Sequence, residues 1–128
     1  MKRFVLGLAL IGLAALTAAC TSGGGAPGPT SPPVSVPAGG SIVIVAKDNK
    51  FLTTSVIAPA DAAFEIVLDN QEAAPHNIAI SDASGANVFK GEIVSSTKVT
   101  NAIPALAAGS YPFICEVHTE MKGTITAE

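Results

Sequence analysis

This chain lacks the features that would mark a nucleic-acid-binding protein or a helical one. Its single arginine is at position 3, and residues 41–128 hold five Lys against ten Asp or Glu, a formal charge of −5. A basic surface for a phosphate backbone is therefore excluded. No stretch of residues 41–128 shows sustained helical periodicity between caps, which excludes a helical domain. Tryptophan is absent, and cysteine, histidine and methionine each occur only twice.

The first 19 residues form a charged start followed by an uncharged apolar run. Lys2 and Arg3 precede the run, which extends from Phe4 to Ala19. This arrangement is typical of a secretory signal peptide, which we assign to residues 1–19. A membrane-spanning helix is the alternative, but the run is shorter than the roughly 18 to 20 apolar residues that cross a bilayer, and no positive cluster follows it.

The sequence LTAAC, which ends at Cys20, resembles the bacterial lipobox. In that motif small residues precede a cysteine that is acylated and becomes the mature N-terminus, and several acyl chains anchor a protein stably. The resemblance implies an exported lipoprotein held at a bacterial membrane through Cys20, with its domain in the periplasm or on the outer cell surface. The alternative is an ordinary signal peptide, with Cys20 as a free thiol or in a disulfide.

Residues 21–40 are rich in Gly, Pro, Ser and Thr and contain no charged or aromatic residue. Such a composition buries too little apolar surface to offset the entropy lost on ordering. We therefore expect residues 20–40 to be a disordered tether that begins with the lipidated cysteine. Residues 41–128 are then expected to form one small folded domain.

Short alternating or β-branched runs recur between turn residues throughout residues 41–128. They are SIVIVA, FLTTSVIA, AFEIVLDN, HNIAI, ANVFKGEIV, TKVTNAI, SYPFICE and KGTITAE. Seven to eight short strands at this spacing predict an all-β fold, a Greek-key β-sandwich, with a small closed barrel as the alternative. In SYPFIC the two-residue period places Tyr111, Phe113 and Cys115 on one face, so Cys115 is predicted to point inward at the end of a strand.

Soft metal-binding side chains are concentrated in the segment CEVHTEM near the C-terminus. Cys115, His118 and Met121 lie there, and His76, the other histidine, opens the predicted strand HNIAI. If Cys20 is lipidated, Cys115 has no disulfide partner, which suggests an intermolecular bond, a reactive thiol or a metal ligand. A buried cysteine acting as a small hydrophobe is the alternative. Together, one thiolate, two imidazoles and one thioether form a ligand set that suits copper.

The pattern PHN, followed after a gap by GSYPFICEVHTEM, resembles the cupredoxins, small blue copper proteins such as plastocyanin and amicyanin. The resemblance covers roughly residues 41–128. It implies one copper ion that alternates between Cu(I) and Cu(II). It also implies that His76, Cys115 and His118 are its equatorial ligands and Met121 its weak axial ligand.

The resemblance also implies a role for Asn77 as a residue that hydrogen-bonds to the cysteine-bearing loop and fixes the ligand geometry. A plain turn residue is the alternative. Many family members have proline in this loop, whereas this chain has Glu116, Val117, Thr119 and Glu120. We therefore expect a less rigid loop, and we expect the carboxylates beside the metal to lower its reduction potential by favouring Cu(II).

The resemblance implies a one-electron carrier rather than an enzyme. Copper nitrite reductases and multicopper oxidases need further histidines for a second copper centre, and a binuclear copper site needs a second cysteine in the loop. Both histidines of this chain are already assigned to one copper site, and the loop contains a single cysteine. The alternative function is a copper-binding module for storage, delivery or resistance without redox traffic. A structural zinc site is disfavoured because zinc gains little from methionine.

The family also implies an electron port at the edge of His118, amid apolar residues that here are Ala73, Ala74, Pro75 and Val117. Redox proteins such as a cytochrome or a membrane oxidase or reductase are the expected partners of this acidic domain. We expect the domain itself to be a monomer.

Overall fold

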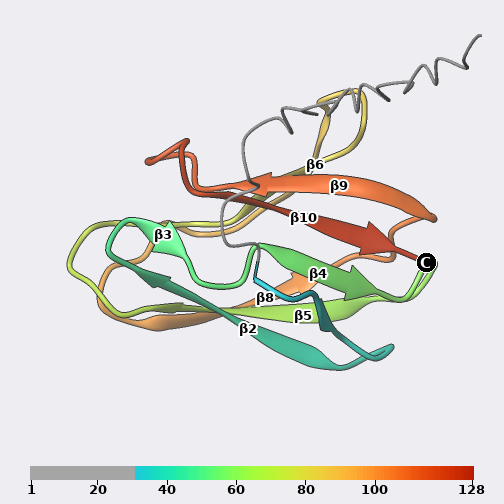
Figure 1. The fold of residues 1–128 in the computed structure, drawn as a ribbon, viewed down its shortest axis with the longest axis horizontal. Helices are drawn as coiled ribbons and strands as arrows, with labels where there is room; N and C mark the ends of the chain where they lie inside the picture. Colours follow the sequence, from blue (N-terminus) through green and yellow to red (C-terminus); the bar gives the residue numbers. More distant parts are fainter. Residues whose placement is uncertain (1–30) are drawn as a thin grey trace, which may run out of the picture.

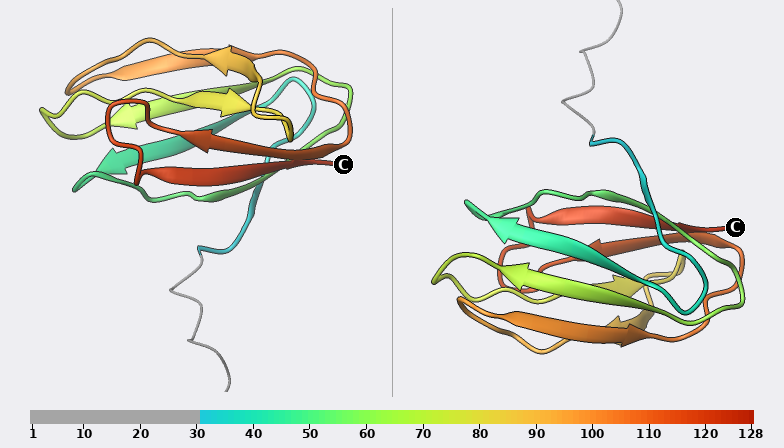
Figure 2. Two further views of the ribbon diagram at one scale, coloured as in Figure 1. Left: turned by 90° about the horizontal axis from the view of Figure 1, so that it is seen from above. Right: turned by 90° about the horizontal axis from the view of Figure 1, so that it is seen from below.

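The computed structural model describes residues 31–128, which form two β-sheets packed face to face (Figure 1). The six-stranded sheet has the order β1-β4-β10-β9-β6-β7, and the four-stranded sheet has the order β3-β2-β5-β8. Figure 2 shows the six-stranded sheet in front on the left and the four-stranded sheet in front on the right. The strands are β1 (Val34–Ser35), β2 (Ser41–Lys47), β3 (Lys50–Phe51), β4 (Ser55–Ala58), β5 (Phe64–Asn70), β6 (Ala79–Ser81), β7 (Asn87–Lys90), β8 (Lys98–Ile103), β9 (Gly109–Ile114) and β10 (Lys122–Ala127).

The predicted all-β Greek-key sandwich is confirmed, and the two separate sheets exclude the closed barrel. Eight of the described strands have three or more residues, and each lies within or overlaps one of the eight predicted runs. The additional strands, β1 and β3, have two residues each and pair at the edges of their sheets. Such short edge strands carry too few residues to show an alternating pattern, which is why the sequence did not reveal them.

Strand pairing begins inside the segment expected to be a tether. β1 runs parallel to β4, and the backbone N–H of Val36 donates to Ile57 O at 2.9 Å. Val36 itself is buried in the core. The predicted signal peptide, the predicted lipidation site Cys20 and the first part of the predicted tether lie outside the described residues.

In residues 31–128 the structure contains no helix that is long and apolar enough to span a membrane.

The core lies between the two sheets and follows the predicted alternation. Phe64, Ile66 and Leu68 of β5 are buried, as are Phe113 and Cys115 at the end of β9. Apolar side chains that alternate along a strand meet those of the facing sheet, and removing them from water is the main favourable term for a domain of this size. The core therefore fixes where β9 ends and, with it, the position of Cys115.

Gly123, at the start of β10, lets β10 lie close to an aromatic side chain. A Cβ at this position would collide with the ring of Phe113 and would come within 2.6 Å of Thr54 O. Because glycine has no side chain, Phe113 can lie against the backbone and still contact Phe51, at a centroid distance of 5.5 Å. This packing anchors both ends of the loop that joins β9 to β10.

Two connections meet at one end of the sandwich. The β9–β10 loop carries CEVHTEM, and the connection from β5 to β6 passes from the four-stranded sheet to the six-stranded one. Figure 1 shows both at the end that carries β3, with the C-terminus at the opposite end. Residues that are far apart in the sequence are thereby brought together at this end.

Candidate metal centre

Three side chains with metal-binding atoms converge at the β3 end of the sandwich. His76 comes from the β5–β6 connection, Cys115 follows β9, and His118 lies in the β9–β10 loop. Their ligand atoms all lie within 4.8 Å of one another. His76 Nδ1 is 3.6 Å from Cys115 Sγ and 3.2 Å from His118 Nδ1. His76 and Cys115 are fully buried, and His118 is partly buried.

His76 is held by its backbone as well as by its side chain. It forms an isolated antiparallel bridge with Val94, in which each N–H donates to the other residue's carbonyl at 3.0 and 2.9 Å. Pro75 precedes it and favours an extended approach to the bridge. The imidazole therefore projects from a fixed backbone position.

Asn70, which was not among the residues predicted for the site, organises the connection that carries His76. Its side chain is buried, and its Nδ2 donates to Ala74 O at 2.8 Å and to Val94 O at 2.7 Å. Its Oδ1 accepts the backbone N–H of Glu72 at 3.0 Å. The signal was present in AFEIVLDN, where Asn70 occupies the next inward position after three buried apolar residues. A polar residue at such a position needs buried partners.

The loop from Cys115 to Met121 is closed by its own backbone. Cys115 N–H donates to Met121 O, and Met121 N–H donates to His118 O, both at 2.9 Å. Met121 is buried and belongs to the same apolar cluster as Cys115. All three predicted ligands of this loop are therefore held on one tight turn, and a bond from the Met121 thioether to the metal remains a prediction.

Asn77 links the two connections. It is fully buried, its Oδ1 accepts the backbone N–H of Glu116 at 2.9 Å, and its Nδ2 donates to Glu116 Oε2 at 2.7 Å and to Gly91 O at 3.2 Å. The hydrogen bond from Asn77 lowers the pKa of the Glu116 carboxyl group, and Lys90, 3.0 Å from Glu116 Oε1, lowers it further. The carboxylate of Glu116, one of those expected to lower the reduction potential, is therefore paired with Asn77 and Lys90.

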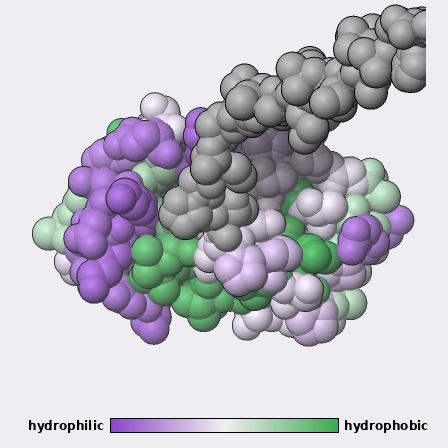
Figure 3. Space-filling view, viewed as in Figure 1, coloured by the Kyte–Doolittle hydropathy of each residue, from purple (hydrophilic) through white to green (hydrophobic). Residues whose placement is uncertain are grey.

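Glu72 contacts the far side of His76 and was also missed. Its Oε1 lies 2.6 Å from His76 Nε2 and accepts the backbone N–H of Asn49 at 2.9 Å. The hydrogen bond from Asn49 is the largest cause of the lowered pKa of Glu72, and the contact with His76 adds to it. Asp48 and Asn49 both have φ of 53°, which is typical of a type I′ hairpin turn. The surface over β3 and this turn is hydrophilic (Figure 3).

These contacts favour one tautomer of His76. A carboxylate at Nε2 calls for a proton there, which leaves the Nδ1 lone pair directed at Cys115 Sγ and His118 Nδ1. Metal bonds of about 2.0 Å to nitrogen and 2.3 Å to sulfur place trigonal ligands roughly 3.5 to 3.8 Å apart. His76 Nδ1 lies 3.6 Å and 3.2 Å from the donor atoms of Cys115 and His118, which is close to this range, and the soft nitrogen-and-sulfur donor set fits copper.

The residues expected around the electron port lie mostly at the surface. Val117 is 41% exposed, Ala73 and Pro75 are exposed, and Ala74 is partly exposed. His118 itself is partly buried. The apolar residues of the predicted patch are thus accessible from solvent.

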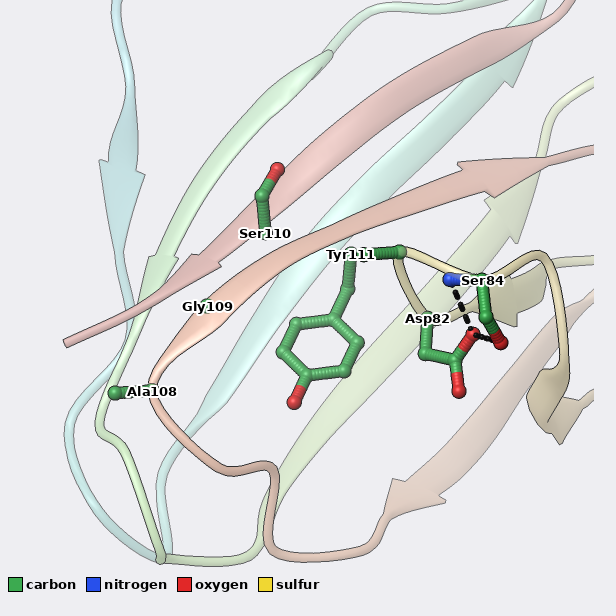
Figure 4. A pocket seen from close by; sticks show the side chains of 7 residues that line it. Asp82, Ser84, Ala108, Gly109, Ser110 and Tyr111 are labelled. Carbon is green, nitrogen blue, oxygen red and sulfur yellow. Dashed lines mark hydrogen bonds between the residues drawn. The ribbon is translucent and has the colours of Figure 1, made fainter.

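A hollow at the other end of β9 is lined in part by Asp82, Ser84 and Tyr111 (Figure 4). Asp82 Oδ1 accepts hydrogen bonds from Ser84 N and Ser84 Oγ, and Tyr111 donates its hydroxyl to Ala107 O at 2.9 Å. The polar groups of these three side chains are engaged within the protein, and the hollow brings together no set of metal ligands.

Comparisons with known proteins agree with this geometry. The sequence model of the Cupredoxin-like domain matches residues 9–127. Amicyanin-alpha of Methylorubrum extorquens is 34% identical over 93 residues, which is 72% of this chain and 75% of that protein. The crystal structure of amicyanin from Paracoccus versutus aligns with a TM-score of 0.56 and 29% identity, over 69% of this chain and 81% of that one. Auracyanin A, a "blue" copper protein of Chloroflexus aurantiacus, shares the fold with a TM-score of 0.63 at 18% identity, over 72% and 99% of the two chains. This chain belongs to the cupredoxin-like family.

Proposed function

We propose that this protein is a one-electron carrier that binds a single copper ion through His76, Cys115 and His118, with Met121 as a weak fourth ligand. The observation that carries the proposal is the convergence of a buried thiol and two imidazoles within 4.8 Å. Membership of the cupredoxin-like family, the similarity to amicyanin-alpha and the fold shared with a "blue" copper protein support it. A bound copper ion would supply one-electron chemistry between Cu(I) and Cu(II).

The protein's own contribution is to keep the donor atoms in place. Glu72 fixes the orientation of the His76 ring, and the backbone bonds of the β9–β10 loop fix Cys115 and Met121. Burial of His76 and Cys115 excludes water from most of the site. Ligands that move little when the charge of the site changes permit fast electron transfer, because little rearrangement accompanies each step.

We propose no catalytic role. Within residues 31–128, His76, Cys115 and His118 form the one cluster of three or more potential metal ligands among His, Cys, Asp and Glu. A second copper centre that binds substrate would need further histidines, and both histidines of the chain already belong to this cluster. The donor set therefore supports a carrier better than an oxidase or reductase.

We further propose that Cys20 is lipidated and that the domain serves redox proteins at a bacterial membrane, such as a cytochrome or an oxidase. The sequence LTAAC supports the anchor, and the exposed apolar residues near His118 support an electron port. Expression in a bacterium tests the anchor. The wild-type protein should partition with membranes and carry acyl groups at Cys20 by mass spectrometry, whereas Cys20→Ala should be soluble. Soluble wild-type protein without acyl groups would contradict it.

The test of the carrier is to add Cu(II) to the metal-free protein. We expect an intense visible thiolate-to-copper absorption at one equivalent, which a mild reductant bleaches and an oxidant restores. Cys115→Ser should abolish this absorption, because a hydroxyl replaces the thiolate. A protein that stays colourless, or that releases its copper on reduction, would contradict the carrier. Release on reduction would favour a storage or delivery module.

A further inference from the structure

The residue that follows Cys115 is linked to two other segments through its side chain. Glu116 Oε2 accepts from Asn77 Nδ2 at 2.7 Å, and Glu116 Oε1 accepts from Lys90 Nζ at 3.0 Å. The backbone N–H of Glu116 also donates to Asn77 Oδ1 at 2.9 Å. We call Lys90, Glu116 and Asn77 together the Lys90 brace.

The Lys90 brace joins three adjacent parts of the six-stranded sheet. Lys90 ends β7 and lies opposite Ala79 of β6, and Ala79 on its other side pairs with Ile114 of β9. Glu116 is two residues beyond Ile114, and its carboxylate reaches back to Lys90 across the ends of these three strands. The brace therefore lies at the end of the sheet from which Cys115 emerges.

The loop between Cys115 and Met121 has no proline to limit its backbone, and Glu116, Val117, Thr119 and Glu120 are exposed. Proline would fix φ and reduce the number of conformations that the loop must lose on folding. In this chain, side-chain contacts add to the two backbone hydrogen bonds that close the loop. The carboxylate of Glu116 can make such a contact, because it bonds to the fully buried amide of Asn77.

We propose that Glu116 and Lys90 are positioning residues for the metal centre. In this proposal Glu116 holds the start of the Cys115 loop closed, and Lys90 compensates the negative charge that this arrangement places beside the thiolate. The compensation of charge by Lys90 is the electrostatic half of the proposal, and it rests on the proposed function. The closing of the loop by Glu116 is the positional half, and it concerns the metal-free protein as well.

An ordinary surface ion pair is the competing explanation. The Lys90 side chain is 60% exposed, and exposed pairs contribute little to stability. The Glu116 side chain is only 32% exposed, and its second oxygen bonds to a buried partner. The two explanations differ in what they predict for the site, because a pair that neither holds the loop nor lies close to the metal would leave access to Cys115 and the reduction potential unchanged.

The electrostatic half predicts shifts of opposite sign. Removing the carboxylate in Glu116→Gln disfavours Cu(II) and should raise the reduction potential, whereas removing the ammonium in Lys90→Met exposes the carboxylate and should lower it. At one fixed solution potential, we expect each substitution to change the ratio of oxidised to reduced protein by about threefold to tenfold. The double variant should lie between the two single variants. Lys98→Met is the matched control, because Lys98 pairs with Asp69 at 3.1 Å across the four-stranded sheet.

The positional half is tested without metal, by the rate at which iodoacetamide alkylates Cys115 in the folded full-length chain. Peptide mapping distinguishes Cys115 from Cys20. Glu116→Ala and Glu116→Gln have the same charge, but only Gln retains an oxygen that accepts from Asn77. We expect Glu116→Ala to be alkylated at least about fivefold faster than Glu116→Gln, because local opening exposes the thiol. Equal rates would overturn the positional half.

The outcomes separate this proposal from the proposed function. A wild-type protein without a reversible copper couple would contradict the proposed function and with it the electrostatic half, and the alkylation rates would still decide the positional half. A reversible couple whose potential is the same in Lys90→Met and Lys98→Met would overturn the electrostatic half alone. Shifts of opposite sign for Lys90→Met and Glu116→Gln, with faster alkylation of Glu116→Ala, would support the whole proposal.

Discussion

Oε1 of Glu72 lies 2.6 Å from Nε2 of His76, on the side of the imidazole that faces away from Cys115. The same oxygen accepts the backbone N–H of Asn49 from the β2–β3 turn. The four-stranded sheet thus contributes to the orientation of His76 through Glu72, although it supplies none of the proposed ligands. Carboxylates that hold the second nitrogen of a ligating histidine fix its tautomer and its ring orientation.

Replacing Glu72 with alanine should weaken copper binding. Without the carboxylate the His76 ring can rotate and change tautomer, and loss of such a partner typically costs about tenfold to 100-fold in metal affinity. Competition with a chelator of known affinity measures the change. Glu72→Gln retains an acceptor oxygen and should lose less than Glu72→Ala.

The control for this prediction is Glu65→Ala, which removes an exposed carboxylate of β5 at the other end of the strand. It changes the net charge equally and should leave the affinity unchanged. If Glu65→Ala and Glu72→Ala weakened binding equally, the general charge of the protein would be responsible, and the specific contact with His76 would not matter.

Gly91→Ala should destabilise the protein and disturb Asn77. A Cβ on Gly91 would lie 2.5 Å from Asn101 Oδ1 and 3.2 Å from Ile78 O, and the carbonyl of Gly91 accepts a hydrogen bond from Asn77. Forcing a methyl group into a filled site costs typically about 1–3 kcal/mol. Urea unfolding of the metal-free protein measures this loss.

A double-mutant cycle identifies the cause of that loss. Asn101→Ala removes the oxygen that the new methyl group would meet, so the cost of Gly91→Ala should be smaller in the Asn101→Ala background. Asn101 also donates to Ile66 O, so its own substitution will carry a separate cost. Strictly additive losses would show that the collision with Asn101 is not the source of the effect.

The sequence predicted the parts of the structure that depend on local pattern. The alternation in AFEIVLDN predicts that Phe64, Ile66 and Leu68 share one face, because a strand directs every second side chain to the same face, and all three are buried. The alternation in SYPFIC predicted for the same reason that Cys115 points inward. The rarity of histidine and cysteine, together with the resemblance of PHN and CEVHTEM to a known family, then identified the candidate donors.

The residues that support the donors could not be predicted in the same way. Glu72 precedes His76 by four positions, but that spacing predicts a contact only on a helix, and this connection is irregular. The contact of Glu116 with Lys90 depends on the order of β7, β6 and β9 in the sheet. Pairing between strands that are distant in the sequence decides these contacts, and one sequence does not specify that pairing.

The loop that contains Asp82 should lose stability in acid. Ser84 N–H, Ser84 Oγ and Ala86 N–H all donate to Asp82 Oδ1, and these bonds, that of the Ser84 side chain foremost, lower the pKa of Asp82 below its ordinary value of 3.8 (Figure 4). A carboxyl group with a lowered pKa stabilises the folded state above its unfolded pKa, and this contribution is lost as the pH falls through the folded pKa. The expected loss therefore begins near pH 4 and continues below it.

Urea unfolding of the metal-free protein between about pH 6 and pH 3 checks this prediction against Asp82→Asn. The wild type should be more stable at the upper end, and the difference between the two proteins should shrink as the pH falls. Other carboxyl groups titrate in both proteins and cancel in the comparison. A difference that is constant across the range would contradict the assigned role of the Asp82 charge.

Met121→Leu separates a weak axial ligand from a residue that merely fills the core. Met121 is buried in the same cluster as Cys115, and leucine has a similar volume, so the swap should cost less than about 1.5 kcal/mol in stability. The protein should keep its copper and its visible absorption, because the cysteine and the two histidines remain. Its reduction potential should rise, because the thioether no longer donates to Cu(II).

Leu106→Met, a comparable swap at a core position outside the loop, should leave the potential unchanged. Loss of copper in Met121→Leu would make Met121 an essential ligand, and an unchanged potential would show that its thioether does not reach the metal.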